Sequence, residues 1–491
     1  MIKNNLETKN NANVIGINLL NNFSEKEING FSYFVDCLHF NTDKYIVRLL
    51  KTLKQDVLGK RQFDEEMKNK VYEKVFSDRV AAKGLSVEQR KRLSAKLTGL
   101  TRLAERFLAI EALEKHEVYR SDLVCQKLLG KKQYLLFNRT VNKERKILAA
   151  QNLRDLTHHS QQYKLAENEL TYLHHTGKIY KKDNLSEMLY HLDIRNCLSK
   201  LSLYLTMLSL KGLTEKQYNT SSTDITLQLL DLPQYADHPV LKVYKVVIEL
   251  MKVGDEETYK ELLHLLESNA TYIPRADLSV FYGILMNSCV RQIRNGKFSL
   301  RDLFDLYQHI EVRGLLVEGD FVDIIKLKNA VIVGCRVGTF EWTTEIIEKY
   351  KSFVDKPIRE SVRHFNLGVI AFYRKDYPAA LHHFIRVDDV SVDYDINCRV
   401  MLMKSYYETD EDYDERTVQI FRTAEKFFKE NKHLSPTRKR GYKNFVRILI
   451  YVYKYRHIST KMTLESIKER LEKQDVNSDK NWLLEKIGEL S

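Results

Sequence analysis

The stretch 361–387 limits what this chain can fold into more than any other part of the sequence, because it carries two helical patterns joined by a short break. Apolar residues recur at helical spacing in its first half, at Val362, Phe365, Val369 and Phe372. Gly368 lies among them, and we expect another helix to approach closely there because glycine has no Cβ. Pro378 suits the first turn of a second helix, whose apolar face follows at Ala380, Leu381 and Phe384. The stretch therefore predicts a helical hairpin.

The same stretch resembles one tetratricopeptide repeat, a helical hairpin of about 34 residues that stacks on copies of itself. The resemblance rests on residues at the consensus offsets, namely Leu367, Gly368, Tyr377, Ala380 and Phe384. Two consensus positions differ, because His364 and Ala371 stand in place of the usual Trp and Tyr. An ordinary helical hairpin in a globular bundle is the alternative interpretation.

Weaker copies of this pattern flank the stretch, so the resemblance covers about 320–430. Downstream, Met401 lies in a further helical pattern and Val418 in that of its partner helix. Upstream, Phe340 takes the place of Tyr377. A single repeat cannot bury its apolar face alone, so the resemblance implies hairpins stacked into a right-handed superhelix. The chain as a whole also resembles bacterial helical repeat proteins, a resemblance that implies no activity.

Strand signals and helix-breaking residues are both rare, which predicts an all-α fold. The chain of 491 residues contains only six prolines, and the first of them is Pro233. No segment shows sustained strand alternation, and a chain of this length needs more than one core. We expect four segments: a loose N-terminal arm over 1–22, an N-terminal helical domain over 23–130, a long helical hairpin over 131–212, and tetratricopeptide-like helical repeats with basic C-terminal helices over 213–491.

The long hairpin is predicted from an unbroken helical pattern. Between Lys131 and Thr176 the sequence has no glycine and no proline. Apolar residues recur every seven positions, at Ala149, Leu156, Tyr163 and Leu170. The pattern predicts one long helix that packs lengthwise against a second helix over 183–210.

The cysteine spacing and the apolar runs bear on the compartment. The six cysteines are far apart and never occur as C-x-x-C, which is typical of buried thiols in a reducing compartment. The first residues lack the pattern of a signal peptide. The longest apolar run, 201–210, is too short to cross a bilayer. We therefore expect a cytoplasmic protein with no membrane partner.

The sequence contains no motif for catalysis, cofactor binding or metal binding. Histidine doublets at 158–159, 174–175 and 382–383 put adjacent rings about 100° apart on a helix, whereas metal-binding pairs prefer i, i+4 spacing. The acidic run 410–415 resembles the opening of a calcium loop, but Glu415 stands where that loop needs glycine. We therefore predict no catalytic, cofactor-binding or metal-binding residue. An enzyme ranks third among the functions, because active sites can assemble from distant residues.

The function that the resemblance implies is a non-catalytic scaffold or adaptor for protein–protein interaction. In tetratricopeptide proteins, the first helix of each hairpin lines a concave surface that binds another protein or peptide. Carried over to this sequence, that surface implies four contact residues, Arg363, Asn366, Ile370 and Lys404.

A basic segment over 432–461 supports nucleic-acid binding as the alternative function. It carries nine Lys or Arg residues, no Asp or Glu, and five interleaved aromatic residues, and basic side chains with exposed aromatic rings can grip nucleic acid. In the competing interpretation, which we favour, the acidic block 388–415 faces this segment and the tyrosines belong to the core. The net charge of +13 permits either interpretation. The candidate patch for an acidic partner consists of Arg438, Lys439, Arg440 and Lys443.

Overall fold

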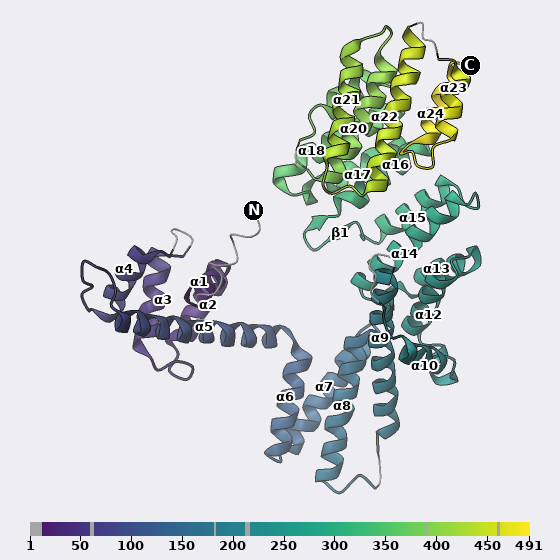
Figure 1. The fold of residues 1–491 in the computed structure, drawn as a ribbon. Helices are drawn as coiled ribbons and strands as arrows, with labels where there is room; N and C mark the ends of the chain where they lie inside the picture. Colours follow the sequence, from purple (N-terminus) through teal and green to yellow (C-terminus); the bar gives the residue numbers. More distant parts are fainter. Residues whose placement is uncertain (1–11, 59–62, 181–182, 212–216, 389, 459–461) are drawn as a thin grey trace. The chain divides into compact units, whose positions relative to one another are not determined.

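The computed structural model describes residues 12–58, 63–180, 183–211, 217–388, 390–458 and 462–491. Within these ranges almost all regular structure is helical, which confirms the predicted all-α class (Figure 1). The strands described are β1 (Val317–Glu318) and β2 (Phe321–Val322), which form one short antiparallel pair. The chain divides into two compact units between Arg195 and Asn196, and Leu153–Asp155 is grouped with the second unit.

The first unit contains helices α1 to α8 and the beginning of α9. Their bounds are α1 (Ala12–Asn21), α2 (Glu25–Asp36), α3 (Lys44–Asp56), α4 (Glu65–Phe76), α5 (Val87–Lys115), α6 (Glu117–Gly130), α7 (Tyr134–Ala150), α8 (Leu156–His175) and α9 (Leu185–Lys211). The division between the units therefore falls within α9 and not at residue 213. Ser24 and Ser86 begin α2 and α5 with capping boxes, in which each serine side chain accepts a hydrogen bond from the backbone N–H three residues later.

Helices α1 to α5 enclose one apolar core, and α1 is part of it. Ile17 and Leu20 of α1 are buried in the same cluster as Phe31 of α2 and Phe107 of α5. The expectation of a loose arm over 1–22 is therefore wrong for residues 12–21, because the apolar side chains of this segment pack on α5. Residues 1–11 lie outside the described residues.

The segment expected to be one helix over 131–176 contains two helices, α7 and α8, which are separated at 151–155. In this break the backbone N–H of Arg154 donates to the carbonyl oxygen of Tyr272 (2.9 Å) and not to a carbonyl of the preceding helical turn. A contact so distant in sequence leaves no local signal, which explains the wrong prediction. Helix α6 packs on both α7 and α8, so it shares their core although sequence analysis placed a boundary at 130.

The lengthwise packing predicted for this region is present between α8 and the first part of α9. Asn184, just before α9, donates its side-chain N–H to the carbonyl oxygen of Ala166 (2.7 Å). Further along, Nδ1 of His191 lies 3.0 Å from Nδ1 of His159. The order of these contacts shows that the two helices run antiparallel.

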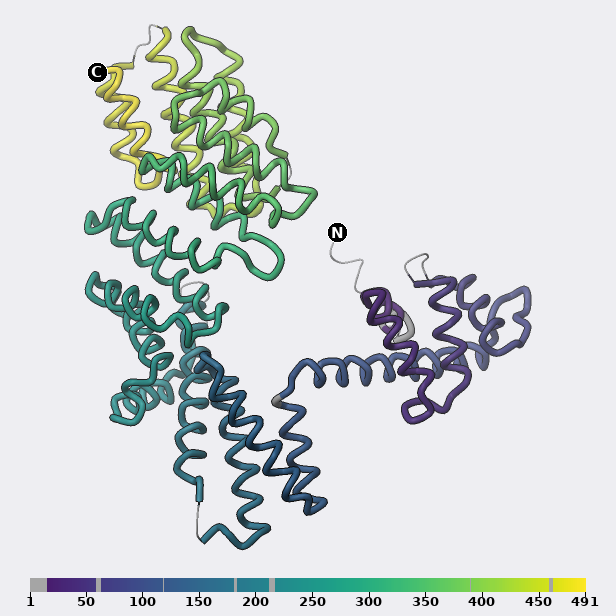
Figure 2. The backbone as a smooth tube through the Cα atoms, turned by 180° about the vertical axis from the view of Figure 1, so that it is seen from behind, coloured from purple at the N-terminus to yellow at the C-terminus, as the bar shows by residue number. Residues whose placement is uncertain are grey.

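The second unit contains the rest of α9 and a series of shorter helices. Their bounds are α10 (Ser221–Leu229), α11 (Pro233–Ala236), α12 (Pro239–Lys252), α13 (Glu256–Asn269), η2 (Ala270–Tyr272), α14 (Arg275–Arg294), α15 (Leu300–Val312), α16 (Ile324–Arg336), α17 (Phe340–Tyr350), η3 (Lys351–Phe353), η4 (Lys356–Ile358), α18 (Arg359–Tyr373), α19 (Tyr377–Phe384), α20 (Val392–Thr409), α21 (Glu415–Glu430), α22 (Pro436–His457), α23 (Leu464–Glu472) and α24 (Lys480–Glu489). Each helix from α12 to α22 packs on the next helix in the chain (Figure 2). In addition, α16 packs on α18 and α18 packs on α20.

The hairpin predicted over 361–387 is present as α18 and α19. Asp376 caps α19 by accepting a hydrogen bond from the backbone N–H of Ala379 (3.1 Å), and Pro378 lies in the first turn. A Cβ added at Gly368 would lie 2.7 Å from Cε1 of Phe384, whose side chain is buried. Gly368 is therefore at the closest approach of the two helices, as the sequence predicts.

Candidate functional site

Three of the four residues predicted to contact a partner are buried. Asn366 and Ile370 of α18 and Lys404 of α20 are at most 5% exposed. Arg363 is half-exposed and lies 3.8 Å from Glu348 of α17. The structure thus corrects the prediction of an open surface made by these four residues, because other parts of the second unit cover three of them.

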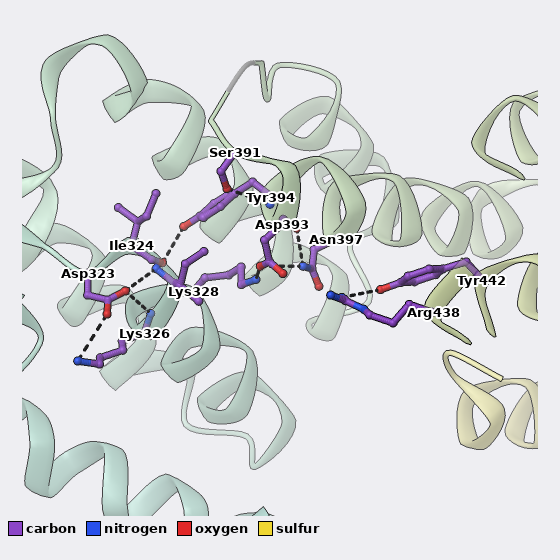
Figure 3. Close-up of polar contacts among 11 residues, drawn as sticks. Asp323, Ile324, Lys326, Lys328, Ser391, Asp393, Tyr394, Asn397, Arg438 and Tyr442 are labelled. Carbon is purple, nitrogen blue, oxygen red and sulfur yellow. Dashed lines mark hydrogen bonds and ion pairs between the residues drawn. The ribbon is translucent and has the colours of Figure 1, made fainter. Parts of the chain in front are cut away.

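The first turns of α16 and α20 contact each other directly over the face of α18, as drawn in Figure 3. Lys328 of α16 is 3% exposed and forms an ion pair with Asp393 of α20. The hydroxyl of Tyr394, also in α20, donates to the carbonyl oxygen of Ile324 (3.0 Å). The Tyr394 ring lies against Phe365 of α18, with ring centroids 4.9 Å apart. Together these contacts join α16 to α20 over the face of α18.

Near the end of α20, the cover is the C-terminal helix α24. Asp479 caps α24 and forms an ion pair with Lys404. Trp482, in the first turn of α24, lies beneath this lysine, with Nζ 4.9 Å from the ring centroid. Its ring centroid is 5.4 Å from that of Tyr407 of α20 and 6.2 Å from that of Phe445 of α22. Trp482 therefore anchors α24 between α20 and α22.

A second ion pair holds the other end of α24. Lys486 is 6% exposed, and its Nζ lies 2.7 Å from Glu408 of α20 and 2.8 Å from Glu489 of α24 itself. Four residues on the other helices contact α24: Lys404, Tyr407, Glu408 and Phe445. We call these four residues the α24-covered face. The face thus presents one cation and one anion, and α24 presents the opposite charge to each.

The two lysines at this contact have displaced pKa values. Burial lowers the pKa of Lys404 despite the carboxylate of Asp479, and the nearby Arg336 lowers it further. Burial alone would also lower the pKa of Lys486, but its hydrogen bonds to Glu408 and Glu489 raise it above the ordinary value. Lys404 is therefore strongly desolvated, whereas the Asp479 side chain is 33% exposed. A pair with a buried member adds little to stability over apolar packing.

The candidate acidic-partner patch lies at the start of α22 and is largely exposed. Arg440 pairs with Asp475 (2.8 Å), and Arg438 donates to the hydroxyl of Tyr442 at 3.4 Å. Lys439 is half-buried and Lys443 is exposed. The patch therefore offers cations to solvent, but its one described ion pair is not with the acidic block 388–415.

The aromatic residues of the basic segment lie mainly in the core. Phe445 and Tyr453 are fully buried, and Tyr442 stacks on Phe428 of α21 at 4.5 Å. The hydroxyl of Tyr453 donates to Asp410 (2.6 Å) and accepts from the backbone N–H of Asp414 (3.0 Å). These rings cannot stack on nucleic-acid bases, so the interpretation of the tyrosines as core residues is confirmed for Tyr453.

Two of the three histidine doublets, 158–159 and 382–383, each contribute one partner to a pair between helices. Nδ1 of His364 in α18 lies 2.9 Å from Nδ1 of His383 in α19, as His159 lies close to His191 in the first unit. Burial lowers the pKa of His364 and His383, and the Arg386 charge adds to the effect at both. Among the described residues, no group of three or more His, Cys, Asp or Glu side chains is arranged to hold a metal ion.

A groove of about 710 Å³ lies in the first unit beside α5. Lys68 of α4 and Arg90, Lys91 and Arg102 of α5 give it a basic lining. Lys68 and Arg90 both pair with Glu65 at 2.6 Å, so one carboxylate offsets part of this positive charge. This groove is a weaker candidate site than the α24-covered face.

Sequence reasoning missed the α24-covered face because its two sides are far apart in the chain. The spacing of Asp479, Trp482 and Lys486 indicates a capped amphipathic helix, and this signal was available. The position of that helix depends on the pairing of Lys404 with a residue 75 positions away, which no local pattern encodes.

In the part of the chain that the structure describes, no helix combines the length and the apolar character needed to cross a membrane. Comparison of the chain with protein-family models, with curated proteins and with solved structures gave no significant match.

Proposed function

We propose that this protein is a non-catalytic scaffold that binds a helical segment of another protein on the α24-covered face. The observation that supports this proposal is the contact with α24 itself. An amphipathic helix there is held by a central aromatic anchor and by an ion pair at each end. Helix-in-groove recognition uses the same elements: apolar anchors at helical spacing for affinity, and charges at the edge for selection.

Nucleic-acid binding is less well supported than this scaffold function. It retains exposed cations at Arg438, Arg440 and Lys443. Single-strand binding uses exposed stacking rings. In the described part of the basic segment, Phe445 and Tyr453 are buried, and Tyr442, Tyr451 and Tyr455 are half-buried. Charge alone gives only salt-sensitive, sequence-independent association.

The proposal is tested by affinity capture with three forms of the full chain: wild type, Lys404→Asp and Lys429→Asp. Lys404→Asp reverses the charge at the α24-covered face, whereas Lys429→Asp makes the same change of net charge at an exposed position of α21. We expect specific proteins to bind wild type and Lys429→Asp and to be lost with Lys404→Asp. If the three forms capture the same proteins, the face is not the binding surface and the proposal is wrong.

A further inference from the structure

We infer that α24 is a ligand of the α24-covered face held in cis, and that the face binds in trans a helix with the same pattern. That pattern is a carboxylate at the N-cap, an aromatic residue three positions later and a lysine seven positions later, as in Asp479, Trp482 and Lys486. The inference rests on the proposed function and adds to it the chemical class of the partner.

The contact of α24 with the α24-covered face includes ion pairs. A buried ion pair gains little stability over apolar packing of the same volume, and removal of either partner leaves an uncompensated buried charge. The α24-covered face buries Lys404 and sets Glu408 against Lys486. Buried pairs of this kind select a partner, since a helix without the matching charges leaves an unpaired charge behind.

Helix α24 is short and is attached through a non-helical segment. It has only ten residues and follows a non-helical stretch over 473–479. Isolated helices this short are marginal in water, so α24 depends on the contact for its structure.

Helix α24 contacts the rest of the second unit along most of its length. Leu483 and Ile487 of α24 are buried one helical turn apart, on the same side as Lys486. The carboxylates of Asp479 and Glu485 lie close enough to Tyr373 of α18 to raise its pKa, an effect that adds to that of burial. A partner helix that carries this pattern, with apolar residues at the positions of Leu483 and Ile487, can replace the ion-pair, aromatic and apolar contacts of α24.

The test uses a fluorescein-labelled peptide with the sequence of residues 475–491 and measures its binding to the full chain by fluorescence anisotropy. In wild type the tethered α24 competes at an effective concentration on the order of millimolar, so the peptide binds weakly. Trp482→Ala in the chain removes the anchor of α24 and should raise the affinity for the peptide at least about tenfold. Asp479→Asn is a second, milder opening variant, for use if Trp482→Ala does not fold by circular dichroism.

A charge exchange locates the binding. In the chain that carries an opening variant, Lys404→Asp should lower the affinity for the peptide by about tenfold or more. A peptide carrying Asp479→Lys should bind this Lys404→Asp chain with the affinity restored. Lys429→Asp, with the same change of net charge, should have no effect. The inference is overturned if the folded opening variants bind no better than wild type, if the exchange gives no recovery, or if neither opening variant folds, since α24 is then an inseparable part of the core.

The two proposals can fail separately. If the peptide binds as expected but Lys404→Asp loses no captured cellular protein, the result supports the inference about α24 and contradicts the proposed function. If Lys404→Asp loses a captured cellular protein but the peptide does not bind, the result supports the proposed function and contradicts the inference that α24 resembles the partner.

Discussion

Gly368→Ala adds a single methyl group at the closest contact in the α18–α19 hairpin. The new Cβ would lie 2.7, 2.9 and 3.0 Å from three ring atoms of Phe384, about 1 Å inside a normal carbon–carbon contact. The ring has little room to move, because Phe384 is 1% exposed and lies against Phe365. Overpacking of this kind costs about 1–3 kcal/mol, whereas replacing a helical glycine by alanine gains about 0.5–1 kcal/mol. We therefore expect a net loss of about 1 kcal/mol in the free energy of unfolding.

Gly283→Ala in α14 is the matched control. It makes the same chemical change within a helix, but no atom outside its own helical turn lies within 4 Å of the added Cβ. This variant should be stabilised by about 0.5–1 kcal/mol. The difference between the two variants removes the helix-propensity gain that they share, so it should equal the overpacking cost of about 1–3 kcal/mol.

Urea denaturation followed by tryptophan fluorescence measures these effects. The two tryptophans of the chain, Trp342 and Trp482, both lie in the second unit, so their signal reports that unit. In a Phe384→Leu background the ring is gone, and Gly368→Ala should no longer destabilise. The reasoning is refuted if Gly368→Ala stabilises as much as Gly283→Ala does, or if its cost persists without the ring.

Three further outcomes are expected. Because burial lowers the pKa of His364 and His383, the unfolded state binds more protons than the folded state near and below about pH 6.5. The free energy of unfolding should therefore fall as the pH drops from about 7.5 to about 5.5, and it should fall less steeply in the variant His364→Asn/His383→Asn. Equal slopes for wild type and this variant in urea titrations would contradict the expectation. Asp393→Asn leaves Lys328 buried without its ion pair and should cost about 1–3 kcal/mol by the same titration, whereas a neutral result would show that water reaches the lysine. The last variant replaces Arg438, Lys439, Arg440 and Lys443 by Glu. It should lower the free energy of unfolding modestly, more so at low salt, and we expect both wild type and the variant to bind oligonucleotides negligibly. Micromolar oligonucleotide binding by wild type that the variant abolishes would favour the nucleic-acid function.

Local signals in the sequence predicted the hairpin of α18 and α19 and mark the start of other helices in the second unit. Ser435 and Pro436 mark the start of α22, where the Ser435 side chain accepts from the backbone N–H of Arg438 (3.3 Å). Gly368 marked a close approach that the structure confirms. Caps, prolines and glycines act within a few residues, so one sequence is enough to read them.

Contacts between distant residues account for what the sequence did not predict. The break after α7 involves a hydrogen bond from Arg154 to Tyr272. Lys404 looked like a surface residue because lysines are seldom buried, and only Asp479, far along the chain, makes its burial possible. The resemblance to a tetratricopeptide repeat implied contact residues on α18 and α20, but it carried no information about the chain's own segments that cover them.

The contact between α16 and α20 also bears on how the second unit comes apart. In a linear array of hairpins, each unit touches only its neighbours, and an end unit can fray without disturbing the others. Here the Lys328–Asp393 ion pair and the hydrogen bond from Tyr394 to Ile324 link helices that have a whole hairpin between them. Opening α20 therefore breaks contacts of α16 as well as those of α18, so these three helices gain protection against hydrogen exchange as one cooperative block.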